Sequence, residues 1–280
     1  MIELERVSDS VWAHTKGKTR GNGAFIKLKD NLVMVDTGMD PVTTKNLREQ
    51  AEKETGLPFK YVILTHYHTD HVFGNQVFED CEILSTKATY NIMKKNKEVQ
   101  WTEENLKERM KETPELKKKW KDLRIVLPTK TFEERYTIEE AGKKVRIVEA
   151  NGHTEGDVYV YLPDEDILIV GDLLFAKTYP YGGDPTADPY LWIQALDEMI
   201  KSHPKKVVPG HGPITKTEEL KLHRNYLNDL VEEMKRFVKL GRRKAELEAY
   251  DNWPDFPYEV DTDRHQSMLE HTYEFVKKNT

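Results

Sequence analysis

The residues with the most evident chemistry in this chain stand in one loop, directly after a short apolar run at residues 61–64. Four side chains of this loop could ligate a metal ion, and they are His66, His68, Asp70 and His71. Because the whole chain has only 10 histidines, such a density is not typical of a polar surface loop. Imidazole nitrogens and a carboxylate oxygen, without a thiolate, indicate a divalent metal such as zinc at a catalytic site.

Three more candidate ligands lie downstream, and each follows a short apolar run that is typical of a strand. His153 follows residues 145–148, Asp172 follows residues 167–170, and His211 follows a third such run. Each stands in a glycine-containing loop, where the backbone can turn tightly and approach an ion closely. Loops at one end of a sheet can converge on one point, so we expect these residues to meet the first group.

Strands and helices that could position these loops are visible as apolar patterns. Early strands are predicted at residues 2–7, 11–14, 24–28, 32–35 and 81–84. A helix is predicted from Asp40 to about Glu54, because Asp at the N-cap followed by Pro is a typical helix start. Amphipathic helices are predicted at residues 189–201, with Leu191 on the apolar face, from residue 217 onward, and at about 263–277.

In their order, these motifs resemble the metallo-β-lactamase-fold hydrolase superfamily. The His-x-His-x-Asp-His signature at 66–71 is followed by Gly-His-Thr at 152–154, Gly-Asp at 171–172 and Gly-His-Gly-Pro at 210–213. The resemblance starts at Asp36, in the run Val-Met-Val-Asp-Thr-Gly. In related proteins such an aspartate supports the metal loops by hydrogen bonding and does not bind the metal.

The resemblance implies an α/β fold, a four-layer αββα sandwich of the metallo-β-lactamase type. We expect a single domain over residues 1–280, with a helical insertion at about 86–124 and C-terminal helices at about 217–280. The insertion is interpreted either as a solvated helical surface or as a lid or homodimer contact. In the second interpretation, Trp101 and Trp120 would be its anchors.

The resemblance also implies a dinuclear site. One metal would be held by His66, His68 and His153, the other by Asp70, His71 and His211, and Asp172 would bridge the two ions. The expected cofactors are two divalent ions, zinc in the first instance, with manganese or iron as alternatives. A bridging carboxylate is physically sensible, because two dications held close together repel each other.

The chemistry that follows is metal-dependent hydrolysis. The two ions would lower the pKa of a bridging water, so that a hydroxide exists near neutral pH. That hydroxide would attack a small ester, thioester, lactone, amide (β-lactam-like) or phosphoester substrate. Asp70 is the expected catalytic residue, because it could orient the nucleophile and transfer a proton.

The markers of subfamily point in several directions. Asp172 occupies a position that is typically not Asp in true β-lactamases, and residues 171–175 resemble the glyoxalase II type. Phe175 stands where lactonases usually carry Tyr, and His68 stands where flavodiiron proteins carry Glu. Residues 126–213 look most like hydrolases near the sulfatase and quinoprotein-associated members. The alternative function is an iron-dependent oxidoreductase of the persulfide dioxygenase type, which the identity of the metal would discriminate.

Two loops are candidates for substrate contact. In the loop after Asp172, Lys177, Tyr179 and Tyr181 are predicted to touch substrate, with packing and solvation as the alternative. The segment 14–23 is interpreted either as an ordinary hairpin turn or as a flap over the site. The flap would offer a set of aromatic and basic side chains, namely Trp12, His14, Lys16, Lys18 and Arg20.

Composition limits the classes of partner. The 280 residues carry a formal charge of −6, which argues against nucleic acid as the main partner. Cys81 is the only cysteine and is predicted to be a core residue, so no intramolecular disulfide can form. The start lacks a signal-peptide pattern, and no apolar run could span a membrane. We therefore expect a soluble, cytoplasmic enzyme that acts on a small molecule.

Overall fold

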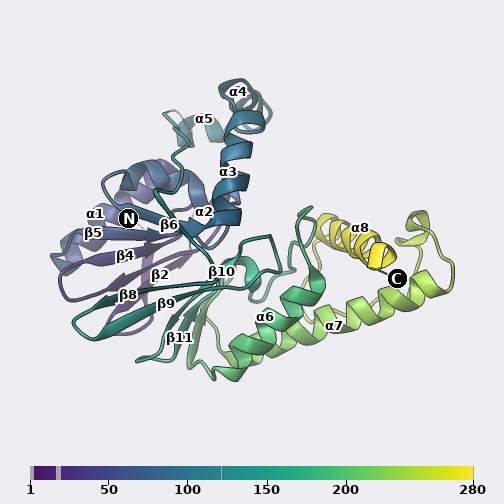
Figure 1. Ribbon diagram of the computed structural model, residues 1–280. Coiled ribbons are helices and arrows are strands. Elements are labelled where there is room, and N and C mark those ends of the chain that lie inside the picture. Colours follow the sequence, from purple (N-terminus) through teal and green to yellow (C-terminus); the bar gives the residue numbers. More distant parts are fainter. Residues whose placement is uncertain (1–2, 17–19, 121, 280) are drawn as a thin grey trace.

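Two sheets packed face to face form the centre of the fold (Figure 1). The computed structural model describes residues 3–16, 20–120 and 122–279, and the strand counts that follow refer to these residues. The seven-stranded sheet has the order β1 (Glu3–Arg6), β2 (Val11–Lys16), β3 (Gly23–Lys27), β4 (Leu32–Val35), β5 (Phe59–Ile63), β6 (Glu82–Thr86) and β7 (Lys130–Phe132). The five-stranded sheet has the order β12 (Lys206–Val208), β11 (Ile167–Ile169), β10 (Val158–Leu162), β9 (Lys143–Glu149) and β8 (Arg135–Glu140).

Helices cover the outer face of each sheet, which confirms the four-layer αββα sandwich. Strand side chains alternate between two clusters, as the two-residue period of a strand requires. In β5, Ile63 points to the cluster between the sheets, and its neighbour Val62 packs under the helices on the other face. Cys81 is buried in the second cluster, and burial raises the pKa of its thiol to about 12. The prediction that Cys81 is a core residue is confirmed.

Parallel pairing brings the ends of the functional strands together. Strands β4, β5, β6 and β7 are parallel neighbours in the first sheet, and β11 and β12 are parallel in the second. Asp36 therefore leaves β4 at the same edge at which β5 enters the loop of His66. Short helical segments follow directly after β5 and β11, and they are α2 (Thr69–Val72), η1 (Phe73–Phe78) and η2 (Gly171–Leu173).

The predicted helices are present, with one correction to their apolar faces. They are α1 (Pro41–Thr55), α6 (Pro189–Lys201), α7 (Thr217–Lys239) and α8 (Thr262–Asn279), and a short turn η3 (Lys244–Glu246) lies between the last two. As predicted, Asp40 caps α1 by accepting a hydrogen bond of 3.0 Å from the backbone N–H of Val42. Leu191 was expected to face inward but is 41% exposed, and Trp192 is buried instead. Trp192 lies three residues before Ala195, so it shares the buried face of α6.

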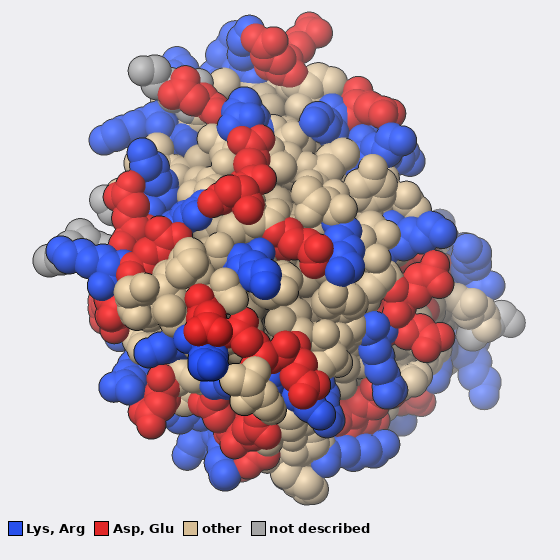
Figure 2. Space-filling view, turned by 60° about the vertical axis from the view of Figure 1, so that its left-hand side comes forward, with Lys and Arg blue, Asp and Glu red and all other residues tan. Residues whose placement is uncertain are grey.

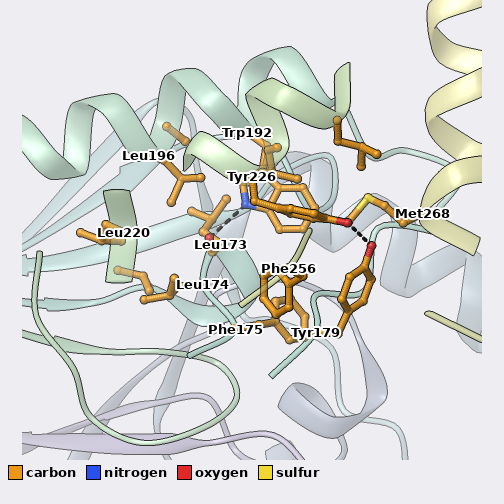
Figure 3. Packing of buried hydrophobic residues seen from close by; sticks show 14 of the residues in the cluster. Leu173, Leu174, Phe175, Tyr179, Trp192, Leu196, Leu220, Tyr226, Phe256 and Met268 are labelled. Carbon is orange, nitrogen blue, oxygen red and sulfur yellow. Dashed lines mark hydrogen bonds between the residues drawn. The ribbon is translucent and has the colours of Figure 1, made fainter. Parts of the chain in front are cut away.

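A cluster of aromatic and aliphatic side chains joins the C-terminal helices to the loop after β11 (Figure 3). The indole Nε1 of Trp192 donates a hydrogen bond of 3.0 Å to the backbone oxygen of Leu173. Phe175 and Tyr179 of this loop pack in the same cluster, and so does Met268 of α8. The helical layer therefore fixes the backbone of the segment that carries Asp172.

The insertion is helical, as predicted, and consists of α3 (Lys87–Val99), α4 (Glu103–Glu112) and α5 (Leu116–Lys119). Trp101 and Trp120 are both buried, and each ring packs edge-on against Phe73 at a centroid distance of 5.3 Å. The indole of Trp120 also donates to the backbone oxygen of Met39. These tryptophans therefore hold the insertion against its own chain.

The surface shows no concentration of one charge on the face in Figure 2, where Lys and Arg alternate with Asp and Glu over the described residues. That face lacks the continuous basic stripe that nucleic-acid binding requires. Within residues 3–16, 20–120 and 122–279, none of the helices combines the length and the apolar character that crossing a bilayer demands.

His223 of α7 is buried beside Phe175 and Trp192, with ring centroids at 6.5 and 5.5 Å. Neither of its ring nitrogens has a hydrogen-bond partner among the described residues. Burial lowers its pKa to about 3, because the charged imidazolium would lose its hydration there. The unfolded chain, with a histidine pKa of about 6.5, binds this proton much more readily.

We expect His223→Phe to flatten the acid branch of the stability curve. Between about pH 6.5 and pH 3 the unfolded state holds one more proton at this position, so stability falls as pH falls. From pH 7 to pH 5 the parent chain should lose about 2 kcal/mol more unfolding free energy than the variant. Urea unfolding of chelator-treated protein measures this difference. The control is His203→Asn, at an exposed position, which should keep the parent's pH dependence. If the unfolding free energy of His223→Phe falls with pH as steeply as that of the parent, the lowered pKa of His223 is contradicted.

Candidate metal centre

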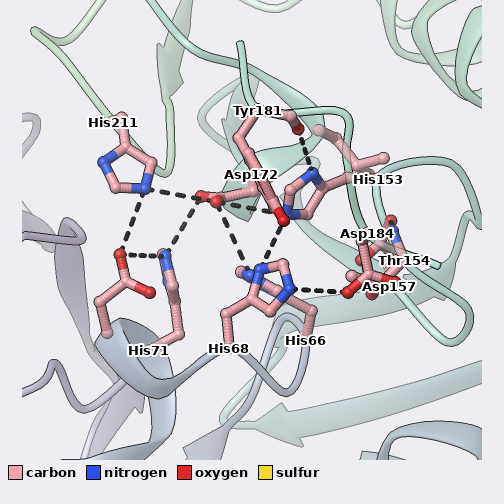
Figure 4. A network of polar contacts seen from close by, with 12 residues as sticks. His66, His68, His71, His153, Thr154, Asp157, Asp172, Tyr181, Asp184 and His211 are labelled. Carbon is pink, nitrogen blue, oxygen red and sulfur yellow. Dashed lines mark hydrogen bonds and ion pairs between the residues drawn. The ribbon is translucent and has the colours of Figure 1, made fainter. Parts of the chain in front are cut away.

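All seven candidate ligands converge at the edge of the two sheets (Figure 4). Four come from the loop and helix that follow β5, and three come from the loops after β9, β11 and β12. They form two groups, in each of which the potential ligand atoms lie within 4.8 Å of one another: His66, His68, His153 and Asp172 in one, and Asp70, His71 and His211 in the other. The structure thus brings together every residue that the sequence motifs indicated.

The carboxylate of Asp172 lies between the two groups. Its Oδ2 is 3.4 Å from His153 Nε2 and 3.3 Å from His211 Nε2, and its Oδ1 is 3.2 Å from His71 Nε2. Only 4% of this side chain is exposed. One buried anion is therefore shared by imidazoles from both groups.

The polar atoms at this centre fit a bound cation. Among the described residues, three deeply buried atoms of the cluster lack a hydrogen-bond partner, namely His66 Nε2, His71 Nε2 and Asp172 Oδ1. Buried polar atoms without partners are costly and rare. Imidazole nitrogens and carboxylate oxygens with this arrangement are the usual ligands of zinc and of similar divalent ions.

Burial sets the protonation of the ligands in the absence of metal. Burial lowers the pKa of His153 to about 3 and that of His66 well below its usual value, so both offer neutral imidazoles. Burial also lowers the pKa of His71, but the carboxylates around it, Asp172 first, outweigh this effect and raise the pKa well above normal. The carboxylates around His71 thus favour its protonated ring, so a metal ion at this residue competes with a proton.

Asp36 holds one ligand in place, as expected from the resemblance. It accepts hydrogen bonds of 2.7 Å from the backbone N–H and from the hydroxyl of Thr65. Its Oδ2 also lies 2.8 Å from His71 Nδ1, which directs Nε2 of that ring toward Asp172. The φ of Asp36 is 58°, a left-handed conformation that turns its side chain back to the loop.

Asp184 supports a second ligand, and sequence reasoning missed it. Its Oδ2 lies 2.9 Å from His68 Nε2 and accepts a hydrogen bond of 2.6 Å from the Tyr67 hydroxyl. His68 therefore presents Nδ1 to the centre, 3.0 Å from His153 Nε2. Asp184 stands in the loop after Asp172, in which substrate contacts were predicted. Its local sequence does not distinguish it from an ordinary aspartate in a turn.

Two glycines allow the backbone to approach the ligands. A Cβ on Gly210 would overlap Asp172 Oδ1, and a Cβ on Gly21 would lie 2.7 Å from His71 Nε2. Gly210 also donates its N–H to the backbone oxygen of Gly171, at 2.6 Å. Gly210 of the Gly-His-Gly-Pro motif is thus required by close packing on the buried carboxylate.

A cavity of about 940 Å³ opens onto the centre. Tyr181, Arg20 and Trp101 line it, together with ligands of both groups. Lys177 and Tyr179 do not: Lys177 is exposed elsewhere, and Tyr179 is buried with its hydroxyl on Tyr226 and His265. Tyr179 instead packs beneath the site, because its hydroxyl finds partners on the C-terminal helices.

The proposed flap is a hairpin of β2 and β3, in which His14 pairs with Gly23. Trp12 is buried and stacks on Phe25, His14 is also buried, and Lys16 pairs with Glu3. None of these three lines the cavity, and Lys18 lies outside the described residues. Of the flap residues described, Arg20 alone reaches the cavity wall.

Comparisons with known sequences all point to one protein family. Residues 17–211 match the sequence model of the metallo-beta-lactamase superfamily. A metallo-beta-lactamase type 2 of Bacillus cereus is 29% identical over 225 residues, 76% of this chain and 77% of that protein. A linear primary-alkylsulfatase of a Pseudomonas species is 23% identical over 80% of this chain and 48% of its own. An acyl-coenzyme A thioesterase of Gallus gallus is 26% identical over 59% of this chain and 61% of its own.

Solved structures share the fold. A metallo-beta-lactamase from Pontibacter korlensis superposes with a TM-score of 0.66 and covers 82% of this chain and 100% of its own. Its sequence identity is 24%, so this likeness speaks for the fold alone.

We expect Gly210→Ala to weaken metal binding, because the new methyl group would push Asp172 away from the imidazoles. Displacing such a ligand or its support costs roughly 10- to 100-fold in metal affinity. Competition with a chromogenic chelator measures the affinity. Gly142→Ala is the matched control, since its Cβ meets nothing within 4 Å although its φ of 86° carries backbone strain. Equal affinities in Gly210→Ala and the parent would refute the close-packing argument.

Proposed function

Because this chain belongs to the metallo-beta-lactamase superfamily, we propose that it is a hydrolase that uses two divalent metal ions, zinc in the first instance. The observation that carries this proposal is the convergence of two ligand groups on the shared carboxylate of Asp172. The bond that it cleaves belongs to a small ester, thioester, lactone, amide or phosphoester.

The ligand groups suggest how two ions would be divided. His66, His68 and His153 would hold one ion, Asp70, His71 and His211 the other, and Asp172 would contact both. When bound, such ions activate water as a nucleophile and neutralise negative charge that develops on the substrate. The chain's own contribution is to keep these ligands fixed through Asp36 and Asp184, and to keep most of them from bulk water.

Asp70 is the group that we expect to handle the proton. Its Oδ2 lies 3.4 Å from His211 Nε2 and 3.8 Å from His71 Nε2, and 20% of the side chain is exposed. It also lines the cavity, so it faces both the ligand cluster and the space for substrate. A carboxylate in that position can accept a hydrogen bond from the attacking water and pass its proton to the leaving group.

The relatives guide the choice of substrates. Their names specify a β-lactamase, an alkylsulfatase and an acyl-coenzyme A thioesterase, which cleave three different kinds of bond. Their common feature is hydrolysis, and this favours a hydrolase over the iron-dependent oxidoreductase. The substrate panel should therefore include a β-lactam, an acyl thioester, a lactone, a phosphodiester, a phosphotriester and a sulfate ester.

We expect metal-loaded protein to contain about two divalent ions per chain and to hydrolyse at least one member of this panel. Elemental analysis and initial rates measure the two properties. His68→Ala removes a ligand and serves as the blank. A single bound iron ion with no hydrolysis above the blank would overturn the proposal and favour the oxidoreductase.

We expect Asp70→Ala to lower kcat roughly 100- to 10,000-fold on the best substrate, as loss of a general base or acid does. Metal content is measured on the same sample, because Asp70 also belongs to a ligand group. The matched control is the exposed Asp251→Ala, which should keep the parent rate. Full turnover in Asp70→Ala with both ions retained would exclude a catalytic role.

A further inference from the structure

The cavity above the metal centre carries an unusual number of cationic side chains. They come from the hairpin, the insertion and the C-terminal helix, and they are Arg20, Lys95, Arg109 and Arg264. The chain as a whole has a formal charge of −6, so this concentration runs against its overall balance. The carboxylates that line the same cavity, Asp70, Asp172 and Asp184, are already engaged with histidines.

Among the described residues, no ion pair involves Arg20, Lys95 or Arg109. Helix α4 shows the contrast, because its Lys107 and Lys111 each pair with a glutamate of the same helix. Arg20, Lys95 and Arg109 thus reach the cavity wall without an ion-pair partner in the described part of the chain, although all three side chains are exposed.

Arg264 lies nearest to the metal ligands through a series of contacts. Its guanidinium carbon is 5.7 Å from the centre of the Phe175 ring, and that ring stacks on His211 at 4.9 Å. Its Nη1 donates a hydrogen bond of 2.9 Å to the backbone oxygen of Tyr179. Its Nη2 has no hydrogen-bond partner in the described part of the chain. One face of the guanidinium is fixed, and donor groups remain for a ligand.

Asp261, which forms an ion pair with Arg264 within the described residues, does not saturate it. Asp261 Oδ2 lies 3.8 Å from Arg264 Nε, and 54% of the Asp261 side chain is exposed. An exposed pair at that separation contributes little. Asp261 therefore neutralises the charge of Arg264 only weakly, and this charge can act on an anion in the cavity.

Helix α8 is held firmly enough to make Arg264 a defined part of the site. Cβ atoms on Gly182 and Gly183 would overlap Met268 and Ser267, so the loop before Asp184 packs directly on this helix. His265 Nδ1 lies 2.7 Å from the Tyr179 hydroxyl. Helix α8 also lies beyond residues 17–211, which match the superfamily model, so that match assigns no role to Arg264.

Resting on the proposed hydrolase function, we propose that the substrate carries an anionic group and that Arg264 binds this group beside the scissile bond. A planar guanidinium with free N–H groups matches a carboxylate, phosphate or sulfate in a two-bond arrangement. Lys95, Arg109 and Arg20 line the same cavity and attract such an anion at longer range. Met39, Ile92 and Trp101 offer apolar surface for the rest of the molecule, so the substrate is an amphipathic anion.

The test uses matched substrates in the bond class that the hydrolysis panel finds fastest. Their acyl or alkyl parts differ only in the group carried next to the scissile bond, which is carboxylate, phosphate, sulfate, neutral methyl or ammonium. We expect one anionic substrate to exceed the neutral one at least roughly tenfold in kcat/KM, as a charged hydrogen bond would give. Arg264→Gln should lower kcat/KM for that anion by roughly 10- to 100-fold, mainly through KM, and leave the neutral substrate within about twofold.

Lys278→Gln, an exposed substitution on the same helix, is the matched control and should keep the parent's preference. Arg264→Lys keeps the charge and should restore part of the preference. If Arg264 had only a structural role, its substitution would lower kcat/KM for the anionic and the neutral substrate alike. That result overturns the proposal. Equal rates for anionic and neutral substrates in the parent also overturn it.

A binding measurement separates this proposal from the hydrolase proposal. Benzoate, phenylphosphonate, benzenesulfonate and neutral benzamide are titrated calorimetrically into metal-loaded parent, Arg264→Gln and Lys278→Gln protein. Tighter binding of an anion that depends on Arg264 supports the anion site even if no substrate is hydrolysed. Hydrolysis without any dependence of anion binding on Arg264 supports the hydrolase and rejects the anion site.

Discussion

The buried carboxylate of Asp172 is the group on which the arrangement of the site depends. Burial by itself would raise its pKa, but the charges of the neighbouring imidazoles, His211 first and His71 next, outweigh that effect and hold the pKa well below its usual value. An isolated charge in this position would cost several kcal/mol, so the surrounding ligands and the carboxylate need one another. The turn at Gly210 and the short helix η2 are placed so that this oxygen pair can be reached from both ligand groups.

The strand order brings the ligands together, and the packing of the helices holds them in position. Parallel pairing of β4 with β5 and of β11 with β12 puts four loops at one edge of the sandwich. The helices α6 and α8 then press on the loop after β11 through Trp192 and Met268. Trp192 also packs edge-on against the ligand His153, with ring centroids 5.4 Å apart, and both contacts restrict where Asp172 can lie. Fixed ligands need less reorganisation when an ion or substrate binds.

Much of this was predictable from sequence, and the failures have physical causes. The ligands were found because each follows an apolar strand and stands near a glycine, and the helix starts because Asp40-Pro41 is a strong local signal. Asp184 was missed because its bond to His68 joins residues 116 positions apart. Tyr179 was misplaced because its partners, Tyr226 and His265, lie on helices whose docking no local pattern reveals. Leu191 was misassigned because Trp192, one position on, fits the buried face.

The origin of the ligands has a consequence for how the two halves of the fold stay together. Each ligand group contains residues from both sheets: His153 joins His66 and His68, and His211 joins Asp70 and His71. An ion in either group would act as a cross-link between the sheets at their open edge. Its binding free energy would then add to the free energy of unfolding by mass action. The rigidity of the sandwich would be set by the metal supply as well as by the apolar layer between the sheets.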